Sequence, residues 1–171
     1  PAFKEAIAMH DAEIEAIVTS AEEPTFENTI VALDNSGIKL YEISLIFGML
    51  SSSDLDAEMD AVQNEITPIL EEHSNAIMLN DALFQRVKAV YDKRKSLKLD
   101  EVQMRLVEKT YNEFVSSGDL PEGEAKERLK QLNAELAMLT VDFNKNLLAE
   151  NAAFTLHLEA NQVAELPDGV K

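Results

Sequence analysis

Residues 121–151 read PEGEAKERLKQLNAELAMLTVDFNKNLLAEN, and this stretch decides the fold class. Apolar residues recur along it in steps of four and three, so that they share one side of an α-helix of about seven turns at ~3.6 residues per turn. Pro121 suits the first turn of such a helix. The spacing is typical of a coiled-coil packing face, which is formed here by Ala125, Leu129, Leu132, Leu136, Leu139, Phe143 and Leu147.

The same periodicity extends towards the beginning of the chain. It predicts a first helix that starts near Phe3 and ends near residues 18–20, with one buried stripe. A short helix is expected between Pro24 and the pair Ser36-Gly37, with Thr25 as its N-cap. Residues 38–50 carry too many apolar side chains for one stripe, and we expect this segment to be buried on more than one side.

Two interruptions of the helical pattern are predicted in the middle of the chain, one at a polar turn and one at a proline. Residues 51–54 predict a turn, and a helical pattern resumes at Leu55. Pro68 lies inside that pattern and predicts a kink near Ile66-Thr67, or a new start with Thr67 as the cap. Further helices are expected from Asn80 to the basic cluster 93–95, and from Asp100 to the turn 116–118.

The sequence therefore predicts an all-α protein with about six mostly antiparallel helices, of which the one near 121–151 is longest. Residues 153–159 alternate between apolar and polar side chains and predict one short strand. A lone strand is not stable, so we expect it to pair outside this fragment. We assign residues 1–151 to a helical domain, and residues 152–171 to a strand and turn that lead into an absent catalytic region.

Composition and charge exclude several classes of function. The formal net charge is −17, and residues 1–85 carry 17 acidic side chains but two basic ones, Lys4 and Lys39. Such a field repels nucleic acid and anionic lipid, and it is typical of a solvated acidic face. No apolar stretch is long enough to span a membrane, and the absence of cysteine excludes thiol nucleophiles and Cys-bound zinc in this chain. The chain begins with Pro1 and not with Met, so we expect it to start inside a longer one.

No local catalytic or metal motif is present. A zinc peptidase motif H-E-x-x-H needs two histidines at i and i+4, whereas His10, His73 and His157 are each more than 60 residues apart. We interpret His10 as a partly buried structural residue, His73 as a residue near a helix end that interacts with the helix dipole, and His157 as part of the strand. We interpret the paired carboxylates as surface groups, and we assign no catalytic, cofactor-binding or metal-binding residue in this chain.

Several of these segments resemble one known family. PAFKEAIAMHDAEIEAIV (1–18) followed by PTFENTIVALDNSG (24–37) resembles the N-terminal region of peptidyl-dipeptidases, also called dipeptidyl carboxypeptidases, in the thimet oligopeptidase-like family of zinc metallopeptidases. AIMLNDALFQRVKAVYDKR, LDEVQMRLVEKTYNEFVSSG and LKQLNAELAMLTVDFNKNLL are similar to its successive helices. One departure is Glu165, which stands where the family often has Gly in an Ala-Gly-Leu-Pro element.

The resemblance implies a larger zinc enzyme whose metal site lies downstream, on H-E-x-x-H and a further Glu. Zinc would activate water there, with the motif Glu as base, and helices such as these would form one wall of a channel that admits short peptides. None of those catalytic residues maps onto this sequence. The implied partners are the chain's own catalytic domain and, in the whole protein, short peptide substrates.

Two functions stay open. The first is a non-catalytic N-terminal helical fragment of a zinc metallopeptidase that hydrolyses short oligopeptides and releases C-terminal dipeptides. The alternative is a free-standing acidic helical module that binds a partner protein. The predicted unpaired strand favours the first. A cytoplasmic location is favoured and export stays open; the subtype, peptide preference and oligomeric state are not readable from the sequence.

Overall fold

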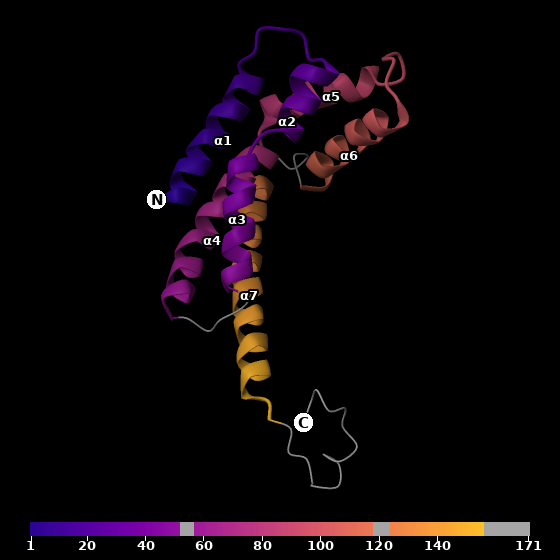
Figure 1. The fold of residues 1–171 in the computed structure, drawn as a ribbon. Helices are drawn as coiled ribbons and strands as arrows, with labels where there is room; N and C mark the ends of the chain where they lie inside the picture. The colour runs from indigo at the N-terminus through magenta and orange to yellow at the C-terminus, as the bar shows by residue number, and fades with distance from the viewer. Residues whose placement is uncertain (52–56, 118–123, 156–171) are drawn as a thin grey trace, which may run out of the picture.

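The computed structural model describes residues 1–51, 57–117 and 124–155, which form a head and a stalk (Figure 1). The head contains η1 (Phe26–Val31), α2 (Ala32–Asp34), α5 (Asp81–Lys93) and α6 (Glu101–Ser117). The stalk contains α3 (Ile38–Ser51), α4 (Ala57–Met78) and α7 (Glu124–Ala153). Helix α1 (Ala2–Val18) lies beside α3 and reaches the head with its C-terminal half.

The prediction of an all-α fold is confirmed. In Figure 1, α1 and α4 run upward while α3 and α7 run downward, so consecutive stalk helices are antiparallel. Helix α7 has 30 residues and is the longest helix in the described part of the chain. Within that part no strand occurs, α7 continues to Ala153, and residues 154–155 have no regular structure. The rest of the expected strand, residues 156–159, lies outside the described residues, as does most of the proposed segment 152–171.

The hydrophobic core lies in the head. Its members come from α1, η1, α5, α6 and the end of α4, and they are Ile14, Ile17, Phe26, Ile30, Ile77, Leu83, Phe84, Val87, Val90, Val107 and Phe114. Phe84 stacks on Phe114 with ring centroids 6.1 Å apart, which brings α5 against α6. Burial of these side chains gives the head its own source of stability.

The entry into the head is capped as the sequence predicts. The Thr25 hydroxyl accepts a hydrogen bond from the Asn28 amide at 3.1 Å, and the Asn28 side-chain oxygen accepts one from the Thr25 amide at 2.8 Å. This reciprocal pair is a capping box in which Asn28 takes the place of the usual Glu or Gln. The helix that follows begins as one π-helical turn, η1, which buries Thr29 together with Phe26 and Ile30.

The predicted restart at Thr67 is wrong. Helix α4 continues through Pro68, and the Thr67 hydroxyl donates to the Gln63 carbonyl at 2.7 Å instead of capping a new helix. The neighbouring helix α7 supports this part of α4, because Ile66 and Val141 are both buried in the stalk. Tertiary packing therefore holds together a helix that local propensity would interrupt. Among the described helices, none is long and apolar enough to cross a bilayer.

Candidate interaction surface

Helix α7 packs against α4 with a face that carries both polar and apolar side chains. The Asn133 side-chain amide donates to the Asn75 side-chain oxygen at 2.8 Å, and Lys145 Nζ donates to Asn64 Oδ1 at 3.1 Å. Val141 is the buried apolar residue of this face. The inward side of α7 is thus held by side-chain hydrogen bonds together with apolar packing, because Ala134, Ala137, Met138 and Leu148 on the Val141 side are also partly buried.

The predicted coiled-coil face of α7 points away from α4. We call its exposed members the leucine seam: Leu132, Leu136, Leu139, Phe143 and Leu147, with exposed fractions between 44% and 65%. These five apolar side chains lie on one side of α7. The spacing predicted the face correctly, but no helix in the described part of the chain packs on it as a coiled coil would.

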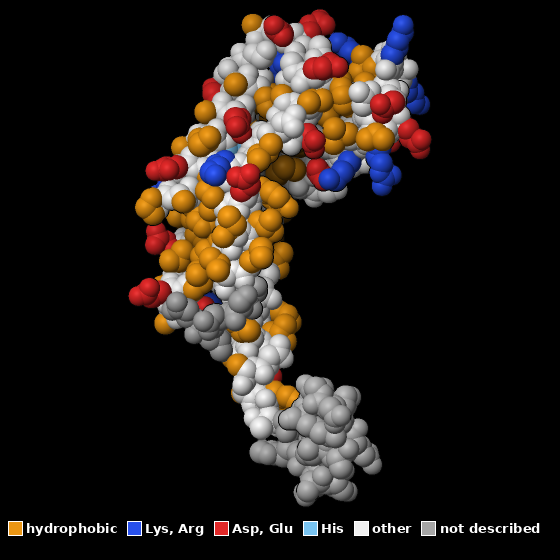
Figure 2. All heavy atoms as spheres, viewed as in Figure 1, with side chains coloured by type: hydrophobic (Ala, Val, Ile, Leu, Met, Phe, Trp, Pro, Cys, Tyr) orange, Lys and Arg blue, Asp and Glu red, His pale blue; other side chains and the backbone are white. Residues whose placement is uncertain are grey.

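Helix α3 is the second exposed apolar element, and the prediction that residues 38–50 are buried on more than one side is wrong for this chain. Leu40 is its buried residue, because α1 and α4 contact one side of the helix. We call the other side the α3 apolar surface: Ile38, Tyr41, Leu45, Ile46, Met49 and Leu50, each between 51% and 68% exposed. Figure 2 shows hydrophobic side chains gathered over the stalk, where α3 lies in Figure 1.

Apolar surfaces of this extent are uncommon on folded domains. Single exposed apolar residues are normal, whereas contiguous apolar patches mark interaction sites. The acidic side chains visible in Figure 2 lie mainly along the edges of the stalk and over the head, outside this patch. The stalk therefore presents an apolar docking face with a charged margin, which is the general anatomy of a protein interface.

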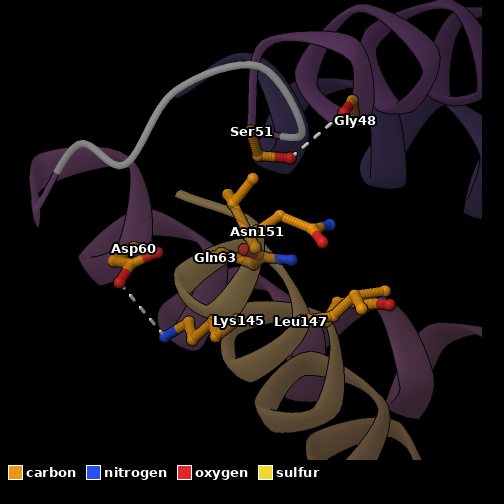
Figure 3. A pocket seen from close by; sticks show the side chains of 9 residues that line it. Gly48, Ser51, Asp60, Gln63, Lys145, Leu147 and Asn151 are labelled. Atoms are coloured by element: carbon orange, nitrogen blue, oxygen red, sulfur yellow. Dashed lines mark hydrogen bonds and ion pairs between the residues drawn. The ribbon is translucent and has the colours of Figure 1, made fainter. Parts of the chain in front are cut away.

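The hollow between α3, α4 and α7 is lined by apolar as well as polar side chains, and Leu147 of the leucine seam and Leu148 are among them. Its lining includes Ser51, Asp60, Gln63, Lys145 and Asn151 (Figure 3). Lys145 points across it to the Asp60 carboxylate, 3.7 Å away, and its side chain is largely buried. This lysine ties α7 to α4, which is a structural role that uses its charge.

The sequence did not predict that two of the histidines contact each other. His10 is half-buried, as predicted, and His73 lies near the C-terminal end of α4, where it is buried against α1. His73 Nε2 is 3.0 Å from His10 Nδ1, and His73 Nδ1 is 3.1 Å from the Asp11 carboxylate. The third histidine, His157, lies outside the described residues.

Within the described residues, the histidine pair and its neighbours do not form a group that could hold a metal ion. Across residues 1–51, 57–117 and 124–155, no three His, Cys, Asp or Glu side chains are grouped so that they could hold a metal ion. The two facing nitrogens are directed at one another, and Asp11 is bound to the far nitrogen of His73. The described residues therefore bring two imidazoles together as a hydrogen-bonded pair.

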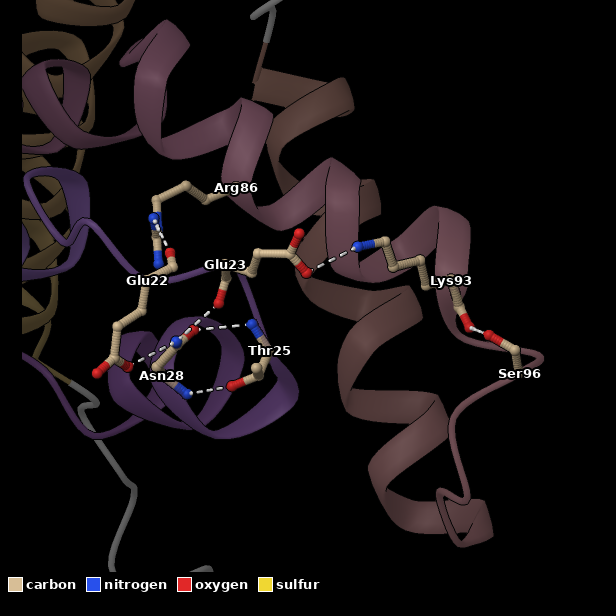
Figure 4. Close-up of polar contacts among 7 residues, drawn as sticks. All are labelled: Glu22, Glu23, Thr25, Asn28, Arg86, Lys93 and Ser96. Atoms are coloured by element: carbon tan, nitrogen blue, oxygen red, sulfur yellow. Dashed lines mark hydrogen bonds and ion pairs between the residues drawn. The ribbon is translucent and has the colours of Figure 1, made fainter.

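A buried arginine fixes the loop between α1 and η1. Arg86 on α5 donates from Nη1 to the carbonyl oxygens of Ser20 at 3.0 Å and Glu22 at 3.2 Å (Figure 4). Nearby, Lys93 forms an ion pair with Glu23 at 3.7 Å. These contacts hold a loop without secondary structure against the head.

Sequence reasoning missed the exposure of the apolar stripes and the histidine pair. The spacing of apolar residues shows which of them share a helix face, but it does not show whether another element covers that face. His10 and His73 are 63 positions apart, and a contact at that distance in the chain has no local signal. The steps of three and four that place His10 on the same face as Ile7 and Ile14 indicate that it faces inward, which was the available hint.

Comparison with known proteins shows clear relatives. The chain is 39% identical over 166 residues to dipeptidyl carboxypeptidase of Escherichia coli (strain K12), which covers 97% of this chain and 24% of that protein. It is 40% identical over 153 residues to dipeptidyl carboxypeptidase of Salmonella typhimurium, covering 90% of this chain and 22% of the relative. A thimet-like oligopeptidase of Dictyostelium discoideum is 27% identical over 149 residues.

The resemblance noted in the sequence is thereby confirmed. The chain spans about a quarter of the length of the curated relatives that it matches. A scan against protein-family profiles finds no match.

Proposed function

From the similarity to dipeptidyl carboxypeptidases over nearly the whole chain, we propose that this chain is a helical, non-catalytic segment of a longer zinc metallopeptidase. In that longer polypeptide, the zinc and the residues that bind it lie in the region this chain does not contain. The proposed substrates are short oligopeptides, from which C-terminal dipeptides are released. The proposed role of this segment is to form one wall of the channel that leads to the metal.

The similarity to dipeptidyl carboxypeptidases carries the proposal, and the leucine seam supports the part of it that concerns an interface. It leaves five large apolar side chains uncovered on one face of α7, and the α3 apolar surface adds a second set on the same stalk. Covering such a surface is favourable by roughly 25 cal/mol for each Å² of apolar area removed from water. The relatives are about four times as long as this chain, so the proposed occupant is the remainder of the same polypeptide.

The first test is the gene that encodes this chain. The proposal expects that codons for an H-E-x-x-H motif follow residue 171 in the same reading frame. It also expects a codon for a further glutamate that binds zinc. A stop codon near Lys171 would instead support the free-standing acidic interaction module.

The second test measures activity and stability of the full-length polypeptide. With a short peptide as substrate, mass spectrometry should detect a C-terminal dipeptide as the first product, and removal of zinc by a chelator should abolish it. The variant Leu136→Asp should lower the stability of the full-length protein by at least about 2 kcal/mol, because it places a charge in the proposed interface. The same variant in the 171-residue chain should change stability by less than about 0.5 kcal/mol, because Leu136 is exposed there.

The matched control is Asn146→Asp, which adds the same charge at an exposed polar position of α7. It should leave the full-length protein unchanged within about 0.5 kcal/mol. Equal effects of the two substitutions in the full-length protein would show that the leucine seam is not an interface.

A further inference from the structure

The two paired histidines join three parts of the fold. His10 is on α1 and His73 is on α4, and their rings meet edge to face with centroids 4.9 Å apart. His10 Nε2 is also 3.1 Å from the hydroxyl of Ser36, in the turn between α2 and α3. The Glu13 carboxylate on α1 accepts the amide of Gly37 in the same turn at 2.7 Å. One cluster of polar contacts therefore holds α1, the α2–α3 turn and α4 together where the head meets the stalk.

The hydrogen bond between the two imidazole rings requires that a single proton lies between their facing nitrogens. A hydrogen bond between two ring nitrogens needs one N–H donor and one bare nitrogen as acceptor. The Asp11 carboxylate accepts from His73 Nδ1, so Nδ1 of His73 carries a proton. His73 Nε2 and His10 Nδ1 then share the remaining site, with the proton on either one of them. The bond persists when one ring of the pair becomes an imidazolium, because one facing nitrogen is still bare.

A second added proton breaks this arrangement. If both rings are imidazolium ions, the two facing nitrogens both carry hydrogen at a separation of 3.0 Å, and neither can accept. The two positive charges also repel each other. The groups that face His10 are His73 on α4, and Glu13 and Asp11 on its own helix, with the neutral Ser36 hydroxyl on the turn.

Burial and the neighbouring His73 together lower the pKa of His10 below its ordinary value of 6.5, against the opposing effects of Glu13 and Asp11. The unfolded chain consequently binds more protons than the folded chain just below pH 6.5. The contribution of His10 to stability is complete above that pH and decreases as the pH falls below it.

We propose that the His10–His73 pair is a proton-controlled latch between α1, the α2–α3 turn and α4, closed while the facing nitrogens hold one proton and open when they hold two. Opening displaces the His10 ring, which contacts Ser36 and lies against Gly37 in the turn from which α3 starts. The latch is separate from the proposed role of this chain in a peptidase, and the inference does not depend on that role. It would make the junction of head and stalk sensitive to acid in the range where histidine titrates.

The direct test is nitrogen NMR of the histidine rings in the complete polypeptide that contains this chain, or in the 171-residue chain if that is the complete polypeptide. The ring shifts of His10 should report a pKa below its ordinary value of 6.5, as expected when a second proton must enter between the facing nitrogens. Titration of His10 at its ordinary pKa would overturn the proposal.

Hydrogen exchange measures opening of the latch. The amide of Gly37 should lose protection as the pH falls from about 7.5 to about 5, by up to about tenfold per pH unit for a one-proton process, after correction for the intrinsic exchange rate. This range lies above the ordinary pKa of a glutamate, near 4.3, so titration of Glu13 does not account for it.

The variant His73→Gln replaces the titrating ring with an amide that can still contact His10, and it should abolish this pH dependence. The control His157→Gln removes the third histidine of the sequence and should retain it. The proposal is overturned if Gly37 protection in His73→Gln keeps the pH dependence of the unaltered protein. The NMR titration decides the matter without any substitution, so a variant that fails to fold does not end the test.

Discussion

The ring of His10 occupies the space that a side chain at Gly37 would need. A Cβ built on Gly37 would lie 2.6 Å from Cε1 and 2.7 Å from Nδ1 of His10. Gly37 also has a φ of +70°, a conformation that L-residues adopt at a cost. The turn before α3 and the position of the His10 ring therefore depend on each other.

Gly37→Ala should destabilise the protein for both reasons. The backbone conformation alone costs about 1–3 kcal/mol for a residue with a Cβ, and displacement of the His10 ring adds to it. Urea denaturation followed by circular dichroism should show the lower midpoint. An unchanged midpoint would contradict the described turn.

Gly48→Ala is the matched control, because nothing lies within 4 Å of a Cβ at Gly48 in α3. Alanine is favoured over glycine in a helix interior by roughly 0.5–1 kcal/mol. The same assay should therefore show a small increase in stability. Opposite signs for the two alanine substitutions separate conformational strain from a general effect of adding a methyl group.

Val141→Ala tests which face of α7 packs on α4. Val141 is buried with 6% exposure, so the truncation should cost about 0.5–3 kcal/mol in the 171-residue chain. Leu139→Ala, on the leucine seam and 59% exposed, should cost less than about 0.5 kcal/mol in the same chain. Thermal unfolding of the two variants checks the assignment, and a reversed order would place the seam against α4.

Arg86→Ala should loosen the loop that follows α1. The substitution removes two charge-assisted hydrogen bonds to carbonyl oxygens, and bonds to charged groups contribute about 1.5–3 kcal/mol each. Within the described part of the chain, Nε and Nη2 of Arg86 are buried without a hydrogen-bond partner, which reduces the net loss. We expect faster proteolysis between Ser20 and Thr25.

The control for this substitution is Arg105→Ala, at an exposed position of α6. It changes the net charge equally and should leave the cleavage rate of the loop unchanged. Equal rates for both variants would show that Arg86 does not hold the loop.

The 171-residue chain alone should bind no stoichiometric zinc and cleave no peptide. This stays a prediction; it rests on the absence of H-E-x-x-H from the sequence and on the two imidazoles of the described histidine pair being directed at each other. Metal analysis of the purified chain by mass spectrometry checks it. One tightly bound zinc per chain would contradict this prediction, and the histidine pair would then be the first site to test for metal binding.

Local features of the fold were predictable because their causes are local. The stripe through Ile14 and Ile17 and the Thr25 cap are set by residues within one or two helical turns. The choice between a kinked helix and a new start at Pro68 was not predictable, because the continuity of α4 there depends on packing against α7.

The candidate site was predictable in part. The spacing of Leu136 and Phe143 correctly predicted that they share one face of α7. Whether that face is buried depends on what covers it, and the sequence of the helix does not determine this. The contact of His10 with His73 arises from the antiparallel return of the chain through α3 and α4, which no short window contains.

The location of the core sets an order of events during synthesis. All members of the head core lie between Ile14 and Phe114, so the set is complete before the ribosome has translated α7. Domains fold as units while the chain emerges at about 5–20 residues per second, and the head can therefore consolidate first. The leucine seam then leaves the exit tunnel attached to a folded anchor, with its apolar side chains exposed.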